Sequence, residues 1–352
     1  MKLIKLFGSS EISLMPAVFF IKDTAGFIVI VKAKELIMPV NASMSVLGVE
    51  RYDSRLDTVL LADSVLEKVC TGALWSEGPV WLEKEQTLLW SDIPNNRILS
   101  WNEKQGMSVW RQPANFSNGH YFDLEGNLLH CSHGGRCIMK TDLATNEVTI
   151  LVDRYLGKRL NSPNDLVVKS DGAIWFTDPP YGILSDVEGY QAESEQTGNY
   201  VYRFDPVTED LQAVCMTMEE PNGLAFSPDE QLLYIADTSA ALRKDGSGNH
   251  HIMVFDVVNG QELENGRVFA TVNPGLSDGF RVDHNGWVYT SSADSVQVYH
   301  HDGTLLGKIM VPETVSNCTF ARDNHFEQGM TLYVTASTSI YRIRLNTEIA
   351  KK

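Results

Sequence analysis

The feature that most constrains this chain is a short segment that occurs six times. Each copy has a small residue or Pro, then Asn or an acid, then usually Gly, and then a mostly apolar run. The copies are 76–81, 117–122, 163–168, 221–226, 277–282 and 316–321. Their second positions lie 39 to 58 residues apart, about 48 on average. Short β-strands that recur at this interval are typical of the blades of a β-propeller.

Several copies continue through a turn into a second strand. In the third copy, Asp171-Gly172 separates two β-rich runs, which is a strong signal for a hairpin. Helical periods are absent, which disfavours helical solenoids. We therefore expect an all-β propeller over about residues 70–345, with a strand from 60–69 closing the ring against the last blade. Such closure would remove the exposed edges of an open sheet.

The second positions of the six copies form a polar set. In a propeller, equivalent positions of all blades lie on a ring around the channel, so these side chains should meet at one mouth. Turn formation by Asn and Asp explains part of the pattern, but it does not explain why two of the six are carboxylates. Two carboxylates among amide oxygens suit a hard cation. The six residues are Glu77, Asn118, Asn164, Asn222, Asp278 and Asn317.

Residues 1–43 do not fit the repeat, so we expect a non-propeller arm at 1–43 and one propeller domain at 44–352. Two apolar runs in the arm are split by Lys22-Asp23, and neither reaches the roughly 20 residues that span a membrane. No clear signal-peptide cleavage site follows them. One hypothesis is a native start at Met44, with the earlier residues a loose arm or an over-extended reading frame.

Composition narrows the function. The net charge is −16, which argues against a nucleic-acid surface because such a surface needs clusters of Lys and Arg. The five cysteines are odd in number and include no C-x-x-C, so reduced thiols are expected rather than a disulfide framework. The expectation is a cytoplasmic protein, monomeric or dimeric, that binds no nucleic acid and no membrane.

Loops at equivalent places in the repeat should form the wall of a pocket around the ring. His133 in 133–136 and Tyr181 in 177–181 are the candidates for substrate contact, and His133 is also a candidate for proton handling. A zinc cluster built from neighbouring His and Cys is disfavoured, because strand alternation sends His130 and Cys131 to opposite faces. The polar insertion 183–199 is either a lid over the mouth or a solvated loop.

These motifs as a set resemble the gluconolactonase branch of the family that also holds senescence marker protein 30 (regucalcin) and luciferin-regenerating enzyme. The resemblance spans roughly residues 65–345. It rests on 76–81, 115–120, 133–136, 161–165, 175–182, 221–223 and 277–279. It implies a six-bladed propeller, one divalent cation in the channel and hydrolysis of sugar lactones.

Carried over position by position, the resemblance makes four ring residues the metal ligands: Glu77, Asn164, Asn222 and Asp278. Asp278 would also transfer the proton, and Asn118 would face the substrate or the outer shell, as would Asn317. Animal lactonases of the family carry a substrate-binding Arg where this chain has Ser162. The sugar preference therefore does not transfer.

The ligand types support this reading independently. An all-oxygen set favours Ca²⁺, with Mg²⁺, Mn²⁺ and Zn²⁺ as alternatives, and four protein ligands leave coordination places open. The cation would polarise the lactone carbonyl, and either Asp278 or a hydroxide on the cation would take the proton from water. The alternatives are a calcium-dependent hydrolase of organophosphates or aryl esters, and a calcium-binding propeller without turnover.

Overall fold

The computed structural model describes residues 18–22, 28–32, 48–62, 64–243, 245–324 and 329–348. The chain divides into two compact units, residues 1–45 and 46–352. In the first unit the described residues form two antiparallel strands, β1 (Val18–Lys22) and β2 (Ile28–Lys32). The rest of the predicted arm, and the proposed start at Met44, lie outside the described residues.

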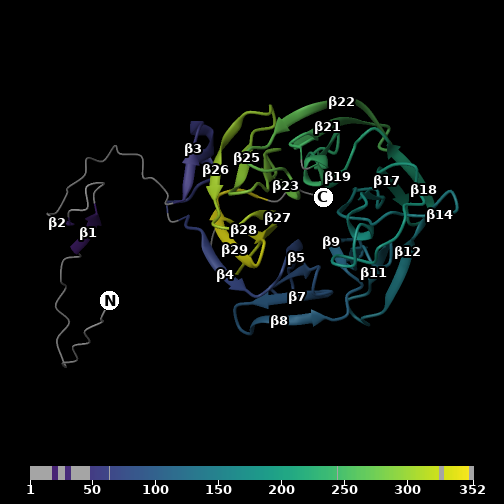
Figure 1. Cartoon of the computed structure of the whole chain (residues 1–352), viewed down its shortest axis with the longest axis horizontal. Helices are drawn as coiled ribbons and strands as arrows, with labels where there is room; N and C mark the ends of the chain where they lie inside the picture. The colour runs from purple at the N-terminus through teal and green to yellow at the C-terminus, as the bar shows by residue number, and fades with distance from the viewer. Residues whose placement is uncertain are drawn as a thin grey trace. The chain divides into compact units, whose positions relative to one another are not determined.

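In the second unit, six antiparallel sheets surround a central axis as the blades of a propeller, as the repeat predicts (Figure 1). The first strand of each blade lies innermost. Blade 1 contains β5 (Ser76–Leu82), β6 (Thr87–Asp92), β7 (Arg97–Asn102) and β8 (Gly106–Arg111). Blade 2 contains β9 (Ser117–Phe122), β10 (Leu128–Ser132), β11 (Cys137–Thr141) and β12 (Val148–Val152). Blade 3 contains β15 (Leu166–Val168), β16 (Ile174–Asp178), β17 (Tyr200–Asp205) and β18 (Asp210–Cys215).

The remaining blades follow the same plan. Blade 4 contains β19 (Pro221–Phe226), β20 (Leu232–Asp237), β21 (His251–Val258) and β22 (Glu262–Thr271). Blade 5 contains β23 (Phe280–Val282), β24 (Val288–Thr290), β25 (Ser295–Tyr299) and β26 (Leu305–Met310). Blade 6 contains β27 (Val315–Ala321), β28 (Met330–Ala336) and β29 (Ser339–Leu345).

Two N-terminal strands complete the last two blades. β4 (Glu67–Thr71) pairs with β29 and so closes the ring, with Thr71 opposite Ser339. The closing strand was expected at 60–69 and lies a few residues later, while Leu60 makes only an isolated bridge to Leu345. β3 (Val49–Arg51), which the sequence did not indicate, adds a fifth strand to blade 5 beside β26.

The connections between strands hold the other regular elements. Three short 3₁₀ helices are η1 (Ser54–Thr58), η2 (Tyr181–Ile183) and η3 (Ser239–Leu242). A small hairpin of β13 (Arg154–Tyr155) and β14 (Lys158–Arg159) leads into blade 3. Within the described part of the chain, no helix has the length and apolar character needed to cross a membrane.

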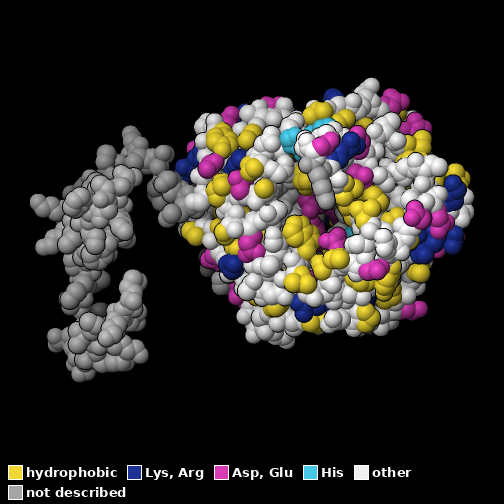
Figure 2. All heavy atoms as spheres, viewed as in Figure 1, with side chains coloured by type: hydrophobic (Ala, Val, Ile, Leu, Met, Phe, Trp, Pro, Cys, Tyr) yellow, Lys and Arg dark blue, Asp and Glu magenta, His cyan; other side chains and the backbone are white. Residues whose placement is uncertain are grey.

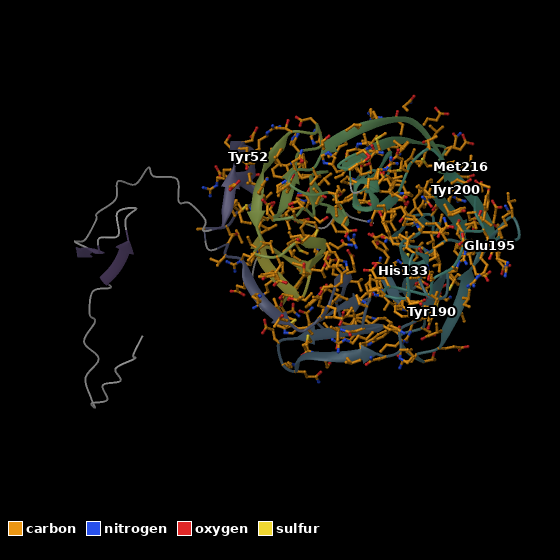
Figure 3. All side chains as sticks on the ribbon, in the orientation of Figure 1. Tyr52, His133, Tyr190, Glu195, Tyr200 and Met216 are labelled. Atoms are coloured by element: carbon orange, nitrogen blue, oxygen red, sulfur yellow. The ribbon has the colours of Figure 1, made fainter. Side chains whose placement is uncertain are left out.

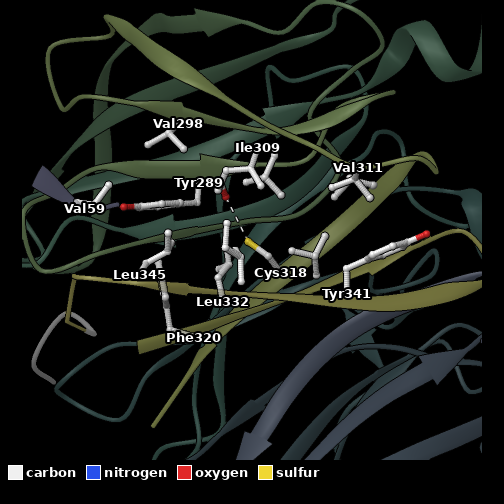
Figure 4. Packing of buried hydrophobic residues seen from close by; sticks show 14 of the residues in the cluster. Val59, Tyr289, Val298, Ile309, Val311, Cys318, Phe320, Leu332, Tyr341 and Leu345 are labelled. Atoms are coloured by element: carbon white, nitrogen blue, oxygen red, sulfur yellow. Dashed lines mark hydrogen bonds between the residues drawn. The ribbon is translucent and has the colours of Figure 1, made fainter. Parts of the chain in front are cut away.

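Apolar side chains fill the spaces between adjacent blades. The cluster between blades 5 and 6 joins Tyr289 and Val298 to Leu332 and Leu345, and Val59 beyond η1 covers its edge (Figure 4). Within it the Cys318 thiol donates to the Tyr289 carbonyl at 3.3 Å. Burying one such aliphatic side chain contributes roughly 1.5–3 kcal/mol. The apolar clusters between adjacent blades therefore stabilise the ring.

The surface and the cysteines agree with the composition. On the face drawn in Figure 2, Lys and Arg side chains are scattered between acidic, apolar and uncharged ones. All five cysteines are unpaired, and four of them are buried. This arrangement agrees with the expectation of thiols without a disulfide framework.

Candidate active site

Five of the six polar positions of the repeat lie at or just before the starts of the innermost strands. Glu77, Asn118 and Asn222 are each the second residue of the first strand of their blade. Asn164 and Asp278 come two residues before the first strands of blades 3 and 5. Because the inner strands surround one axis, all five side chains reach the same end of the channel.

Glycine allows neighbouring blades to bring these residues close. The Gly119 amide donates to the Asn164 carbonyl at 2.9 Å, and the Gly223 amide donates to the Asp278 carbonyl at 3.0 Å. A Cβ at Gly223 would stand 2.4 Å from that Asp278 oxygen, well inside van der Waals contact. The residue pair that defines the repeat therefore lies where the backbones of consecutive blades come into direct contact.

A cavity of about 160 Å³ opens at this end of the channel. The five ring residues just described form its polar base, and its walls are largely apolar. Tyr181, predicted as a substrate contact, is part of the wall, and its hydroxyl is 2.6 Å from the Thr238 hydroxyl. The other lining residues are Trp75, Ile93, Glu188, Thr238, Ala241 and Leu276.

Glu77 is a buried carboxylate, only 4% exposed, whose hydrogen bonds are incomplete. Its Oε2 accepts from the Gly78 amide at 2.8 Å and from Asn317 Nδ2 at 3.3 Å. Its Oε1 is buried without a hydrogen-bond partner. Burial, and then the negative charge of Asp278, raise the pKa of Glu77 well above its usual range. Such a group needs a compensating positive charge.

Asp278 is the second carboxylate of the pair. Burial raises its pKa to about 7, and the nearby negative charges of Glu188 and Asp165 act in the same direction. Interactions with the side chains of Glu77 and Asn222 oppose the rise. Two carboxylates held this close are costly unless a proton or a cation lies between them.

The donor set fits a hard divalent cation. Asn222 donates through Nδ2 to the Thr238 hydroxyl at 3.2 Å, which leaves its Oδ1 available to the cavity. Asn317 is already engaged, because its Oδ1 accepts from the Cys318 amide at 2.8 Å and its Nδ2 donates to Glu77. Oxygen-only donors and the unpartnered Glu77 Oε1 suit calcium or magnesium. Within the described residues, no three His, Cys, Asp or Glu side chains form a metal-holding group, so a cation here would depend on amide oxygens.

His133 lies behind the cavity rather than in its lining. Its Nδ1 is 3.0 Å from the Glu188 carbonyl, which can only accept, so Nδ1 carries the proton. Burial lowers the pKa of His133 to about 4, so the ring is neutral near pH 7. Its Nε2 therefore accepts from Asn118 Nδ2 at 3.3 Å. In this structure His133 orients Asn118 and the segment around Glu188.

Sequence reasoning missed two charged residues below the cavity. Asp165 stands where four of the other five copies have Gly, and its Oδ2 is buried without a hydrogen bond. Arg281 Nη1 lies 3.8 Å from that oxygen and 3.5 Å from Asn317 Oδ1. With Glu77 and Asp278, these groups give three carboxylates and one guanidinium. The replacement of Gly by Asp165 was visible in the repeat, but its contact with Arg281 from another blade was not.

The insertion 183–199 reaches from the centre of the ring to its edge. In Figure 3, His133 lies toward the centre, Glu195 lies at the periphery, and Tyr190 lies between the centre and the edge. Tyr190 packs edge-on against Phe116 with ring centroids 5.2 Å apart, and Glu195 accepts from the Arg159 amide at 2.8 Å. The segment is thus packed against blades 2 and 3, and its Glu188, which sequence reasoning did not single out, lines the cavity.

Comparisons with known proteins agree on one family. Residues 75–338 match the model of the SMP-30/Gluconolactonase/LRE-like region. A gluconolactonase of Zymomonas mobilis is 33% identical over 87% of this chain and 89% of its own length. The structure of a gluconolactonase from Xanthomonas campestris superposes with a TM-score of 0.77 at 40% identity, over 88% of this chain and 99% of that one. A pentonolactonase of Haloferax volcanii is 26% identical over 73% of this chain and 81% of its own length. The chain therefore belongs to the SMP-30/gluconolactonase/LRE-like family.

Proposed function

We propose that the chain is a lactone hydrolase that opens a sugar lactone of the gluconolactone type to its aldonic acid with the help of a divalent cation, calcium first. Lactone hydrolysis is the activity named for the gluconolactonases of Zymomonas and Xanthomonas and for the pentonolactonase of Haloferax. The observation that carries the proposal is the pair of buried carboxylates, Glu77 and Asp278, at the base of an open cavity.

The cation would be held by Glu77, Asp278 and the amide oxygens of Asn164 and Asn222. When bound, it would polarise the lactone carbonyl as a Lewis acid. Two carboxylates would balance its charge, which removes the repulsion between them. Four protein ligands are fewer than the six to eight that calcium takes, so room remains on the cavity side for oxygen atoms of substrate and water.

The chain's own residues would do the rest. Asp278 would accept a proton from the attacking water; its carboxylate interacts with Glu77, and it lines the cavity, which supports this role. Asn118, oriented by His133, presents an amide to the substrate. Trp75, Ile93 and Tyr181 form apolar walls that exclude bulk water and can pack against the carbon face of a sugar ring.

The test measures acid release from δ-gluconolactone with and without chelator, in wild type and two variants. Asp278→Asn should lose roughly 10²-fold or more in kcat, and Glu77→Gln should weaken calcium binding measured by calorimetry. Asp210→Asn, on the exposed outer strand of blade 3, is the matched control and should keep full activity. Near-normal, chelator-resistant turnover in Asp278→Asn would contradict the mechanism.

The same assay separates the alternatives. An organophosphate or aryl-ester hydrolase would turn over those esters faster than the lactone, through the same polarised oxygen. A propeller that only binds calcium would show calcium binding without acid release from any of these substrates.

A further inference from the structure

We propose that Glu188 selects the substrate by accepting hydrogen bonds from the hydroxyl groups of the lactone, so that the site prefers polyhydroxylated lactones to unsubstituted ones. The inference rests on the proposed lactone hydrolysis and adds a residue that determines specificity. Glu188 belongs to the insertion between η2 and β17, which is longer than the equivalent connection of every other blade.

The backbone around Glu188 is held on several sides. Its carbonyl accepts from His133 Nδ1 at 3.0 Å, which ties it to blade 2. The next residue, Gly189, packs on the Gly182 carbonyl so closely that a Cβ would stand 2.0 Å from that oxygen. Farther along, the Ala192 amide donates to the Ile183 carbonyl at 3.0 Å. Glu188 is therefore presented to the cavity from a fixed position, as recognition of a small ligand requires.

The Glu188 carboxylate has no partner among the residues that the structure describes. It lines the cavity, and it makes no hydrogen bond or ion pair with any described residue. Glu188 is half-buried in the cavity wall, and this burial raises its pKa above the ordinary value. A carboxylate in that position gains from a donor supplied by the ligand.

Glu188 is distinct from the proposed cation ligands. It does not combine with Glu77 and Asp278 into a group of three that could hold one ion. Its charge acts on Asp278 through space, and no hydrogen bond joins the two side chains. An ionised carboxylate accepts hydrogen bonds and donates none, whereas the hydroxyls of a sugar lactone are donors. A lactone whose carbonyl lies at the base of a 160 Å³ cavity brings its hydroxyls near the walls.

The experiment compares δ-gluconolactone with δ-valerolactone, which has the same ring without hydroxyls. In Glu188→Leu, kcat/KM for δ-gluconolactone should fall about 10- to 100-fold, mostly through KM, because a hydrogen bond to a charged group is lost. The value for δ-valerolactone, or its inhibition constant where turnover is too slow, should stay within about twofold or improve. Glu193→Leu, an exposed position of the same insertion, should leave both substrates unchanged.

Three outcomes would overturn the inference. An equal loss for both lactones would mean that Glu188 acts on the chemistry or on the shape of the site. Unchanged kinetics for both would mean that it does not touch the substrate. A parallel loss of calcium affinity would make it a cation ligand. By contrast, a wild-type protein that opens neither lactone would refute the proposed function itself.

Discussion

Replacing Gly223 with Ala tests whether close contact between blades builds the site. Gly223 follows Asn222 and donates to the Asp278 carbonyl, so it joins two proposed cation ligands from different blades. An added Cβ would stand 2.4 Å from the Asp278 oxygen and 2.8 Å from the Gly279 Cα. Both contacts are backbone atoms, so rotation of a side chain cannot relieve them.

The magnitude follows from these distances. Non-bonded carbon and oxygen atoms settle near 3.4 Å or beyond, so Asp278 must retreat by about 1 Å. Overpacking of this kind typically costs about 1–3 kcal/mol in the free energy of unfolding. A displacement of about 1 Å at a catalytic group can cost about 10²-fold in rate. We therefore expect Gly223→Ala to lose about 10²-fold in kcat/KM and to bind calcium more weakly.

Gly266→Ala is the matched control, because it lies on the outer strand of the same blade. Its Cβ would also meet a neighbour at 2.4 Å, the ring of Phe255, but far from the cavity. Urea unfolding should show both variants destabilised, whereas acid release should fall only in Gly223→Ala. A Gly223→Ala protein that is as destabilised as the control yet keeps kcat/KM within about twofold would refute the reasoning.

Three further predictions concern charge and chain ends. Burial lowers the pKa of both His120 and His130, that of His120 to about 3, so the unfolded chain binds more protons than the folded one below pH 6.5. The free energy of unfolding should therefore fall by up to about 1.4 kcal/mol per pH unit for each histidine as the pH drops from 6.5 towards 3, and His130→Gln should remove its share of that slope in urea titrations. Arg281→Met should lower the free energy of unfolding by about 3–5 kcal/mol, because it leaves the Asp165 carboxylate without a compensating charge. Adding Asp165→Asn should restore the stability. No recovery in the double variant would argue against the pair. Removing residues 1–43 should leave the melting temperature and lactonase activity unchanged, since β3 and β4 remain, and a loss of either would show that the arm supports the propeller.

The propeller and its ring of polar residues were predictable because both arise from a local pattern that is repeated. Each copy carries its own turn, strand and glycine, and the positions of Glu77, Asn118 and Asn222 in their strands follow from it. The ring of polar residues can therefore be predicted without knowing which distant residues contact each other. The same reasoning placed the closing strand only approximately, because the register of β4 is decided by β29 at the other end of the chain.

Glu188, the position of His133 behind the cavity and the Asp165–Arg281 contact were beyond such reasoning. The insertion that carries Glu188 has no periodicity, and its acidic composition alone is equally typical of a solvated loop. His133 was expected in the wall of the cavity, but it lies behind that wall and contacts Asn118 through its Nε2. This placement depends on how two loops pack. Arg281 meets Asp165 only because nonadjacent blades face each other across the channel.

The closure of blade 6 by β4 has a consequence for biosynthesis. Glu67 and Arg342 join across this seam at 2.9 Å although 275 residues separate them. At about 5–20 residues per second, a ribosome needs roughly 14 to 55 s to make that stretch. During this time β4 has no partner, and the blades already made form an open arc with an exposed edge at each end. Nascent chains of this protein should therefore depend on chaperones until the final strand emerges.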